Sequence, residues 1–203
     1  LQNQAHFRYI RAFGYSEFAA EKHLWIGTDG EGLFQVKINS PDKGRLTHFR
    51  HDDVNPNSLV NNQIRVIHIA PEQKRIWIGT AVGLSRIDFD DDGQVNFKNY
   101  NESSLSNIGF VNDEIKALHQ TNMFGQWMLW IGTDGGGLAR LFVDDIGEEV
   151  FQTYRHEPGN HKSLKNNVVR TILIRENANQ RKEVWLGTDQ GLARLAQDDI
   201  ENG

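Results

Sequence analysis

The sequence predicts an all-β protein made of four copies of one four-stranded unit. The strongest observation is the tetrapeptide Trp-Ile/Leu-Gly-Thr, which recurs at intervals of 52, 53 and 55 residues. A fixed period of this size is typical of repeat architectures. Four of the five tryptophans lie in this one phase. The copies occupy residues 25–28, 77–80, 130–133 and 185–188.

Other motifs keep the same phase. A Gly-Leu pair follows each copy, at residues 32–33, 83–84, 137–138 and 191–192, and an aromatic residue follows in three repeats, at positions 49, 100 and 154. A Ser-Leu pair comes next, at 58–59, 104–105 and 163–164, with asparagines after it at 61–62, 112 and 166–167. The spacing varies only before Ser-Leu and just before the tryptophan strand, as expected where loops cross a surface.

The second repeat shows the expected strands most clearly. A mostly apolar run at 64–69 precedes a turn, the tryptophan strand at 75–80, a glycine turn and a third strand at 84–89. The acidic Asp-Asp-Asp-Gly cluster at 90–93 is a hairpin signal, and residues 95–100 form the fourth strand. No segment shows the 3.6-residue apolar period of a helix.

Four-stranded units that repeat in this way are a sequence pattern typical of β-propeller blades. Strands 24–26 and 128–131 are continuously apolar, which indicates that both faces of a blade pack on neighbours. Within the repeated strand, Trp and Gly share one face because side chains alternate. We therefore expect each repeat tryptophan to be a buried structural plug, and each glycine to leave room for a bulky residue of the next blade.

These residues resemble the repeat of the two-component regulator propeller family. That repeat joins a Leu-Trp-Ile-Gly-Thr strand, a Gly-Leu turn, an aromatic residue at the end of the blade and Asn-Ser-Leu before the next one. Residues 24–28 and 129–133 match the strand without change, and residues 57–62 match the connection. Ile76, Val184 and Leu186 are mild departures. The resemblance covers essentially the whole chain.

The resemblance implies a periplasmic, extracytoplasmic sensor region of a bacterial receptor, either a hybrid histidine kinase or a diguanylate cyclase. In that family the propeller receives a stimulus, often an oligosaccharide, and a transmembrane segment carries the signal inside. A membrane is therefore expected only through the parent protein. The repeat motif holds the fold, so the resemblance transfers no binding residue.

The repeats divide the chain at about 1–50, 51–101, 102–155 and 156–203, within one propeller segment that we expect to be part of a larger propeller. The last repeat stops without a fourth strand and is predicted to be truncated. An unclosed ring would leave Leu192 and Leu195 exposed and promote association. The expected partners are the remaining blades of the parent receptor or a second copy of the chain.

Composition excludes several classes of function. The net charge of −5 and pI near 5.9 argue against a nucleic-acid surface, which normally carries a basic stripe. No apolar run approaches the length of a membrane span. The chain has no cysteine, so it has neither a disulfide framework nor a thiolate metal site.

Motifs of catalysis are absent from the sequence. It contains no phosphate loop, no His-Glu-x-x-His and no Ser-His-Asp order. The acidic turns at 29–32 and 90–93 suggest calcium superficially, but they lack the remaining ligand spacing and read better as solvated turns. We expect no metal and no cofactor. His51 and His156 occupy equivalent loop positions, which suits a polar connector between blades or a ligand slot.

One recurring pattern points to a binding site. The first strand of each repeat carries a basic residue after an apolar one, in the pairs Phe7-Arg8, Ile64-Arg65, Ile115-Lys116 and Val169-Arg170. If this strand is innermost, the cations ring a central channel and attract an anionic ligand. Alternatively they point toward neighbouring blades and pair with acids such as Asp113, Glu114 or Asp29.

In propellers the loops that enter the innermost strand and the turns between the second and third strands share one face. Asparagine and carboxylate groups suit hydroxyl-rich sugars, and the cations favour an acidic unit. The alternative is that Asn and Asp only stabilise turns. The candidate ligand residues are Asn62, Asn112, Asn167, Asp29, Asp134, Asp189, Arg65, Lys116 and Arg170.

Three classes of function stay open at this point. A ligand-sensing segment that is not itself an enzyme is favoured, with an oligosaccharide or anionic small molecule as ligand. A protein-interaction or dimerisation scaffold is second, because a fold alone does not determine function. A propeller polysaccharide lyase or lactonase is third, because it requires a convergent site that the sequence does not display.

Overall fold

The computed structural model describes residues 7–18, 21–39, 41–90, 93–101 and 114–201. Within these ranges the regular structure is β-strand, apart from a single 3₁₀ turn, η1 (Pro71–Gln73), and a short helix, α1 (Gln197–Glu201). The prediction of an all-β fold is confirmed. In this part of the chain no helix has the length and apolar character needed to cross a membrane.

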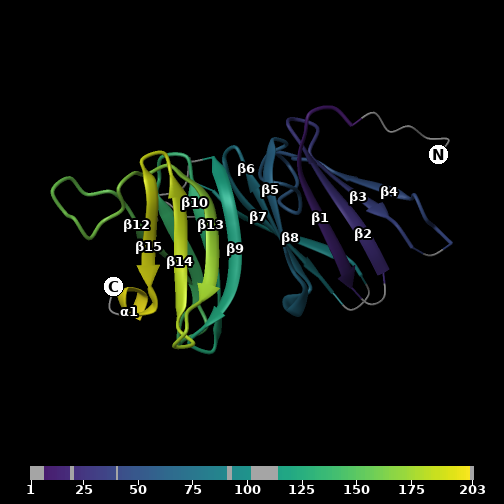
Figure 1. The fold of residues 1–203 in the computed structure, drawn as a ribbon. Helices are drawn as coiled ribbons and strands as arrows, with labels where there is room; N and C mark the ends of the chain where they lie inside the picture. The colour runs from purple at the N-terminus through teal and green to yellow at the C-terminus, as the bar shows by residue number, and fades with distance from the viewer. Residues whose placement is uncertain (1–6, 19–20, 40, 91–92, 102–113, 202–203) are drawn as a thin grey trace. The chain divides into compact units, whose positions relative to one another are not determined.

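Each sheet is an antiparallel meander in which consecutive strands are neighbours (Figure 1). Blade 1 contains β1 (Ile10–Phe18), β2 (Glu21–Thr28), β3 (Leu33–Lys37) and β4 (Leu46–Phe49), and blade 2 contains β5 (Ile64–Ala70), β6 (Arg75–Thr80), β7 (Gly83–Phe89) and β8 (Val95–Tyr100). Blade 3 contains β9 (Ile115–Met123), β10 (Gln126–Thr133), β11 (Leu138–Val143) and β12 (Glu149–Tyr154). Blade 4 contains β13 (Val169–Glu176), β14 (Lys182–Thr188) and β15 (Gly191–Ala196).

These sheets have the topology predicted for propeller blades. The strands expected in the second repeat agree with the observed ones to within one residue at each end. The chain forms two compact units, Leu1–Ser104 with blades 1 and 2, and Leu105–Gly203 with blades 3 and 4. We describe each unit by itself. The expected Ser-Leu pair at 104–105 lies outside the described residues.

In unit 1, the tryptophan-bearing face of blade 1 packs against blade 2. Trp25 is fully buried, and its ring lies 5.9 Å from the ring of Phe89, centroid to centroid. Gly27 lies so close to blade 2 that a Cβ on it would sit 2.5 Å from Cγ2 of Ile64. The roles expected for this tryptophan and this glycine are therefore confirmed.

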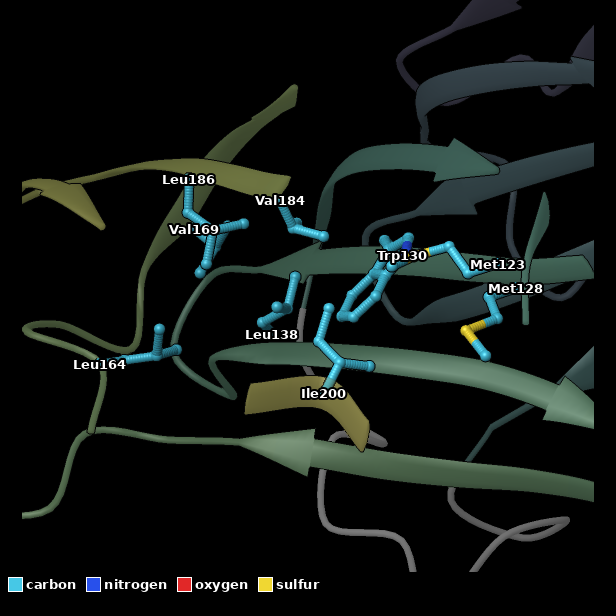
Figure 2. Packing of buried hydrophobic residues seen from close by; sticks show 9 residues of the cluster. All are labelled: Met123, Met128, Trp130, Leu138, Leu164, Val169, Val184, Leu186 and Ile200. Carbon is cyan, nitrogen blue, oxygen red and sulfur yellow. The ribbon is translucent and has the colours of Figure 1, made fainter. Parts of the chain in front are cut away.

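Unit 2 repeats this packing between blades 3 and 4. Trp130 is fully buried, and a Cβ on Gly132 would lie 2.8 Å from the carbonyl oxygen of Val169 in blade 4. Ile200 of α1 is buried in the same cluster, beside Trp130 and Leu138 in Figure 2. The cluster comprises Met123, Met128, Trp130, Leu138, Leu164, Val169, Val184, Leu186 and Ile200.

In blades 1 to 3 the glycine of the Gly-Leu turn is required by both conformation and space. Gly32 has φ +85, and a Cβ on it would collide with the carbonyl oxygen of Phe49, the aromatic residue that ends the fourth strand. Gly83 and Gly137 stand in the same relation to the carbonyl oxygens of Tyr100 and Tyr154. The turn glycine thus leaves room for the backbone carbonyl of the aromatic residue that ends the blade.

The threonine of the repeat closes the same turn. The Thr28 hydroxyl donates to the carbonyl oxygen of Gly32 at 2.7 Å. The other three copies repeat this bond, at 2.8 Å from Thr80 to Gly83, 3.0 Å from Thr133 to Gly137 and 2.8 Å from Thr188 to Gly191. The hydroxyl at the end of each second strand therefore satisfies the glycine carbonyl across the turn, and in blades 1 to 3 this bond is buried.

Blade 4 departs from the expected burial. In blades 1 to 3 the repeat tryptophan packs on the aromatic residue of the fourth strand, and no fourth strand is present in the described part of blade 4. Trp185 is consequently only half-buried, with the guanidinium groups of Arg175 and Arg194 against its ring. Leu192 is 61% exposed, as expected, whereas Leu195 packs partly against the unit 2 core.

Candidate functional site

A β-bulge places the recurring basic residue in every blade. In blade 2, Ile64 pairs with Thr80 and Val66 with Gly79, so Arg65 between them has no cross-strand partner. Such a bulge re-aims one side chain away from the regular alternation. The bulged residues are Arg11, Arg65, Lys116 and Arg170.

The strand register shows that the basic residue in the bulge of blade 1 is not the one predicted from sequence spacing. Ile10 pairs with Thr28 and Ala12 with Gly27, so the blade 1 equivalent of Arg65 is Arg11. The pair Phe7-Arg8 precedes β1 and does not occupy the bulge. Sequence spacing misplaced it because the loop before the tryptophan strand differs in length between repeats.

In unit 1, the carboxylate of Asp29 lies between cations of two blades. Asp29 follows β2 and forms an isolated bridge with Gln63, directly before β5. Its Oδ1 accepts from Nη1 of Arg65 at 2.8 Å and from the Gln63 amide at 3.2 Å, and its Oδ2 accepts from Nη2 of Arg11 at 2.9 Å. Hydrogen bonds from Arg65 and then Arg11 hold the pKa of Asp29 below its ordinary value.

Unit 2 carries an equivalent cluster. Nζ of Lys116 lies 2.9 Å from Asp134 and 3.2 Å from Glu114. Arg170 forms a two-point ion pair with Asp189, whose pKa is lowered by the hydrogen bond from that guanidinium. The two cations of this cluster lie among three carboxylates, those of Glu114, Asp134 and Asp189.

The bulged cation forms an ion pair with an acidic residue of the turn that follows a repeat threonine. In blades 1, 3 and 4 the bulged cation pairs with the acidic residue that directly follows the threonine of its own blade. Blade 2 has Ala81 at that position, and its Arg65 pairs with Asp29 of blade 1 instead. The bulged cations of all four blades therefore pair with nearby acids, which is the alternative that the sequence left open.

The candidate asparagines have a structural task. Oδ1 of Asn62 accepts the backbone N–H of His51 at 2.8 Å, and the carbonyl of Asn62 accepts the N–H groups of Gly30 and Gly32. Asn167 repeats this arrangement in unit 2, with Oδ1 2.6 Å from the backbone nitrogen of His156. Asn112 and Asp113 lie outside the described residues.

The recurring histidines serve the same connection. Nδ1 of His51 lies 2.6 Å from the carbonyl oxygen of Leu59, and Nδ1 of His156 lies 2.6 Å from that of Leu164. Each of these leucines belongs to a Ser-Leu pair and is buried. The histidines therefore act as the polar connectors between blades that the sequence suggested.

Unit 1 also contains a cavity that no pattern in the sequence indicated. A cavity of about 390 Å³ lies at the Glu21 end of β2, whereas Asp29 lies at the opposite end of that strand. Its lining comes from Phe18, Glu21, His23, Gln35, Lys37, Arg45, Thr47, Lys74, Phe89, Asp90 and Gly93. The described residues contain no His, Cys, Asp or Glu cluster that could hold a metal ion.

Comparison with known proteins shows what the chain is similar to in sequence and in fold. No protein-family profile matches the chain. In sequence, the chain is similar to the histidine kinase P4 of Formosa agariphila, at 25% identity over 178 residues that cover 88% of this chain and 12% of that protein.

Solved structures show the same fold. The extracellular domain of a hybrid two-component system from B. thetaiotaomicron has a TM-score of 0.65 at 21% identity, over 98% of this chain and 24% of that one. The β-propeller domain of Cps50 (Swd1) from Myceliophteria thermophila has a TM-score of 0.55 at 10% identity, over 92% and 53%. This chain therefore spans about a quarter or less of the sensor proteins to which it is similar. The repeat motifs, the blade topology and these similarities together confirm what the sequence indicated: the chain is a β-propeller segment whose repeats and fold are similar to those of the two-component regulator propellers.

Proposed function

We propose that the chain is a ligand-sensing segment in the extracytoplasmic part of a bacterial membrane receptor. The proposal is supported by the similarity in sequence to a histidine kinase and in fold to the extracellular domain of a hybrid two-component system. In this proposal the segment lies in the periplasm, and the parent protein supplies the membrane span and the kinase or cyclase output. An alkaline phosphatase fused directly after the segment in the parent receptor should be active, and an inactive fusion with normal expression would contradict this location.

The observation that carries a ligand site is the repeated pairing of a bulged cation with a turn carboxylate. These pairs offer charged donors and acceptors at the same end of each blade, which suits the hydroxyl groups of a carbohydrate. The guanidinium and ammonium groups favour an acidic sugar, and the carboxylates accept from the hydroxyl groups of a neutral one.

We infer that the segment binds its ligand without converting it. Proton transfer near neutral pH is most efficient from groups whose pKa lies near the working pH. Asp29 and Asp189 are instead held in the ionised form by their arginine partners, which lower their pKa values further. Paired, ionised carboxylates suit hydrogen-bond recognition better than acid–base catalysis.

A calorimetric screen of neutral and acidic oligosaccharides tests the proposal. We expect Arg65→Ala and Arg170→Ala each to weaken binding by roughly tenfold, because one charge-assisted bond is lost. Arg181→Ala is the matched control, because Arg181 also forms an exposed ion pair in blade 4 but lies before β14, at the other end of the blade.

Three outcomes are informative. Binding that is reduced in the two bulge variants and unchanged in Arg181→Ala supports the site. Binding that is undiminished in both bulge variants contradicts the site but leaves a sensor role standing. A complete absence of carbohydrate binding contradicts the proposed ligand class.

A further inference from the structure

One face of blade 1 changes from apolar to polar along its strands. Cross-strand partners share a face, so Trp25, Gln35 and Thr47 form one row, and His23 and Lys37 form the next. Toward the Asp29 end this face is filled by aromatic contacts with blade 2. Toward the Glu21 end it carries polar side chains, and the cavity of about 390 Å³ separates it from blade 2.

The cavity has an apolar wall and walls that carry charge. Phe18 of blade 1 and Phe89 of blade 2 contact each other with ring centroids 5.1 Å apart, and both line it. Blade 2 also contributes Lys74, which directly follows η1, and Asp90, at the end of β7. A volume of this size lies at the lower end of the range for small-molecule sites, roughly 300–1,000 Å³.

Some of the lining groups already serve the protein itself. Lys37 is bound to the carboxylate of Glu21. Oδ1 of Asp90 accepts the backbone N–H of Gln94 at 2.8 Å, which closes the turn between β7 and β8. The lining holds the cations Lys37, Arg45 and Lys74 against the carboxylates Glu21 and Asp90, so its net charge is positive.

Three other lining groups are available to a ligand. The side chains of Gln35, Arg45 and Thr47 form no hydrogen bond or ion pair with any described residue. Gln35 and Thr47 are direct partners across β3 and β4, and Arg45 lies two residues before Thr47, so it follows the same face. An amide, a guanidinium and a hydroxyl thus line up along one wall.

His23 adds a polar group that is already desolvated. Only 8% of this residue is exposed, and its Nδ1 has no hydrogen-bond partner within the described structure. Burial lowers the pKa of the ring, more than the neighbouring Glu21 raises it. The imidazole is therefore neutral near pH 7. A buried polar atom without a partner is uncommon in native proteins and often marks a site that a ligand or water completes.

We propose that this cavity is a second binding site, which takes one acidic sugar residue or a closely similar hydroxy acid. Arg45 receives the carboxylate, Gln35 and Thr47 receive hydroxyl groups, and Phe18 and Phe89 cover the apolar face of the ring. Guanidinium groups bind carboxylates in a two-point geometry, which favours an acid over a neutral sugar. The carbohydrate class rests on the proposed sensing function, whereas the location is independent of it, because the charged pairs lie at the other end of the strands.

The test is a titration with D-galacturonate, followed by calorimetry and by the NMR signals of the His23 ring. D-galactose is the neutral comparison. We expect Arg45→Gln to weaken galacturonate binding by about tenfold or more, through loss of a charge-assisted bond. Thr47→Val, on an exposed position of β4, should weaken both sugars by a few-fold, roughly as one neutral hydrogen bond does. The His23 signals should shift on binding in the wild-type protein.

Lys43→Gln is the matched control. Lys43 is exposed in the loop between β3 and β4, two residues from Arg45, and it does not line the cavity. It should leave galacturonate binding unchanged. Equal losses in Lys43→Gln and Arg45→Gln would show an effect of overall charge and overturn the proposal, as would unshifted His23 signals at saturation.

The same titration separates this site from the charged pairs. Arg65→Ala should leave the His23 shifts intact. Binding that is lost in Arg65→Ala and kept in Arg45→Gln would overturn the cavity site while supporting the proposed function. A protein that binds neutral oligosaccharides but not galacturonate would also overturn the cavity site alone, and a protein that binds no sugar would overturn the cavity site together with the proposed ligand class.

Discussion

Asn62 and His51 are joined by a hydrogen bond from the backbone N–H of His51 to Oδ1 of Asn62, at 2.8 Å. The carbonyl of Asn62 at the same time accepts the N–H groups of the glycine turn in blade 1. One residue thus fastens the chain leaving blade 1, the chain entering blade 2 and a turn of blade 1. The asparagines of the repeat act as clamps between blades, because Asn167 makes the same bonds in unit 2.

Replacing Asn62 with Ala should therefore destabilise the protein. The change removes the acceptor for the exposed His51 amide, and we expect a loss of about 0.5–1.5 kcal/mol in the free energy of unfolding. Urea titration followed by tryptophan fluorescence measures it. Asn61→Ala is the matched control, because Oδ1 of Asn61 accepts the N–H of Gln63 two residues away rather than one from the chain leaving blade 1. A control variant as unstable as Asn62→Ala would argue against the clamp.

The fold was predictable because each motif residue has one local physical task. Gly32 is needed for its positive φ and for the approach of the Phe49 carbonyl, and Thr28 closes the same turn. These tasks recur at fixed spacing, so they appear in the sequence as a period. The half-burial of Trp185 was not predictable from the motif alone, because the burial of each tryptophan depends on an aromatic residue of the fourth strand.

Two tryptophan variants test this dependence. Trp130→Ala empties a fully buried site and breaks no side-chain hydrogen bond to the described residues, so we expect a loss of roughly 3–5 kcal/mol. Trp185→Ala should cost less, about 1–2 kcal/mol, because folding removes less apolar surface from water at the half-buried Trp185. Denaturant titration of both variants gives the comparison. A change below about 1 kcal/mol in Trp130→Ala would contradict its role as a plug.

The candidate site was predictable in its residue types but not in its geometry. Spacing indicated recurrent cations and acids, yet the bulge that selects Arg11 over Arg8 depends on strand register. The binding of Asn62 to the His51 amide joins positions eleven residues apart across a loop, and Asn167 binds the His156 amide at the same spacing. The cavity beside His23 follows from the separation of two blades, and no local sequence pattern encodes such a distance.

The close approach of blades at the repeat glycine should make alanine costly there. Gly132→Ala brings a Cβ against the backbone oxygen and the side chain of Val169, neither of which yields easily, and we expect a loss of about 1–3 kcal/mol. Gly187→Ala is the internal control, since its Cβ would meet chiefly the methyl group of Thr171, which can turn away. Thermal unfolding of both variants should rank Gly132→Ala as the less stable, and the reverse order would show that blades 3 and 4 do not rely on this contact.

The ion pairs of Asp29 should make stability depend on pH in a defined direction. Its pKa in the folded protein is lowered by the hydrogen bonds from Arg65 and Arg11, so its contribution is fully present above the ordinary value of 3.8 and is lost as the pH falls through the lower folded value. Urea titrations of the wild-type protein and Asp29→Asn between pH 7 and pH 3 should therefore show a difference in unfolding free energy that is constant near neutrality and shrinks below about pH 4. Asp145→Asn, at an exposed position in the turn before β12, should follow the wild-type curve. A difference between wild type and Asp29→Asn that stays constant down to pH 3 would mean that the ionised carboxylate of Asp29 gains nothing from its two arginines.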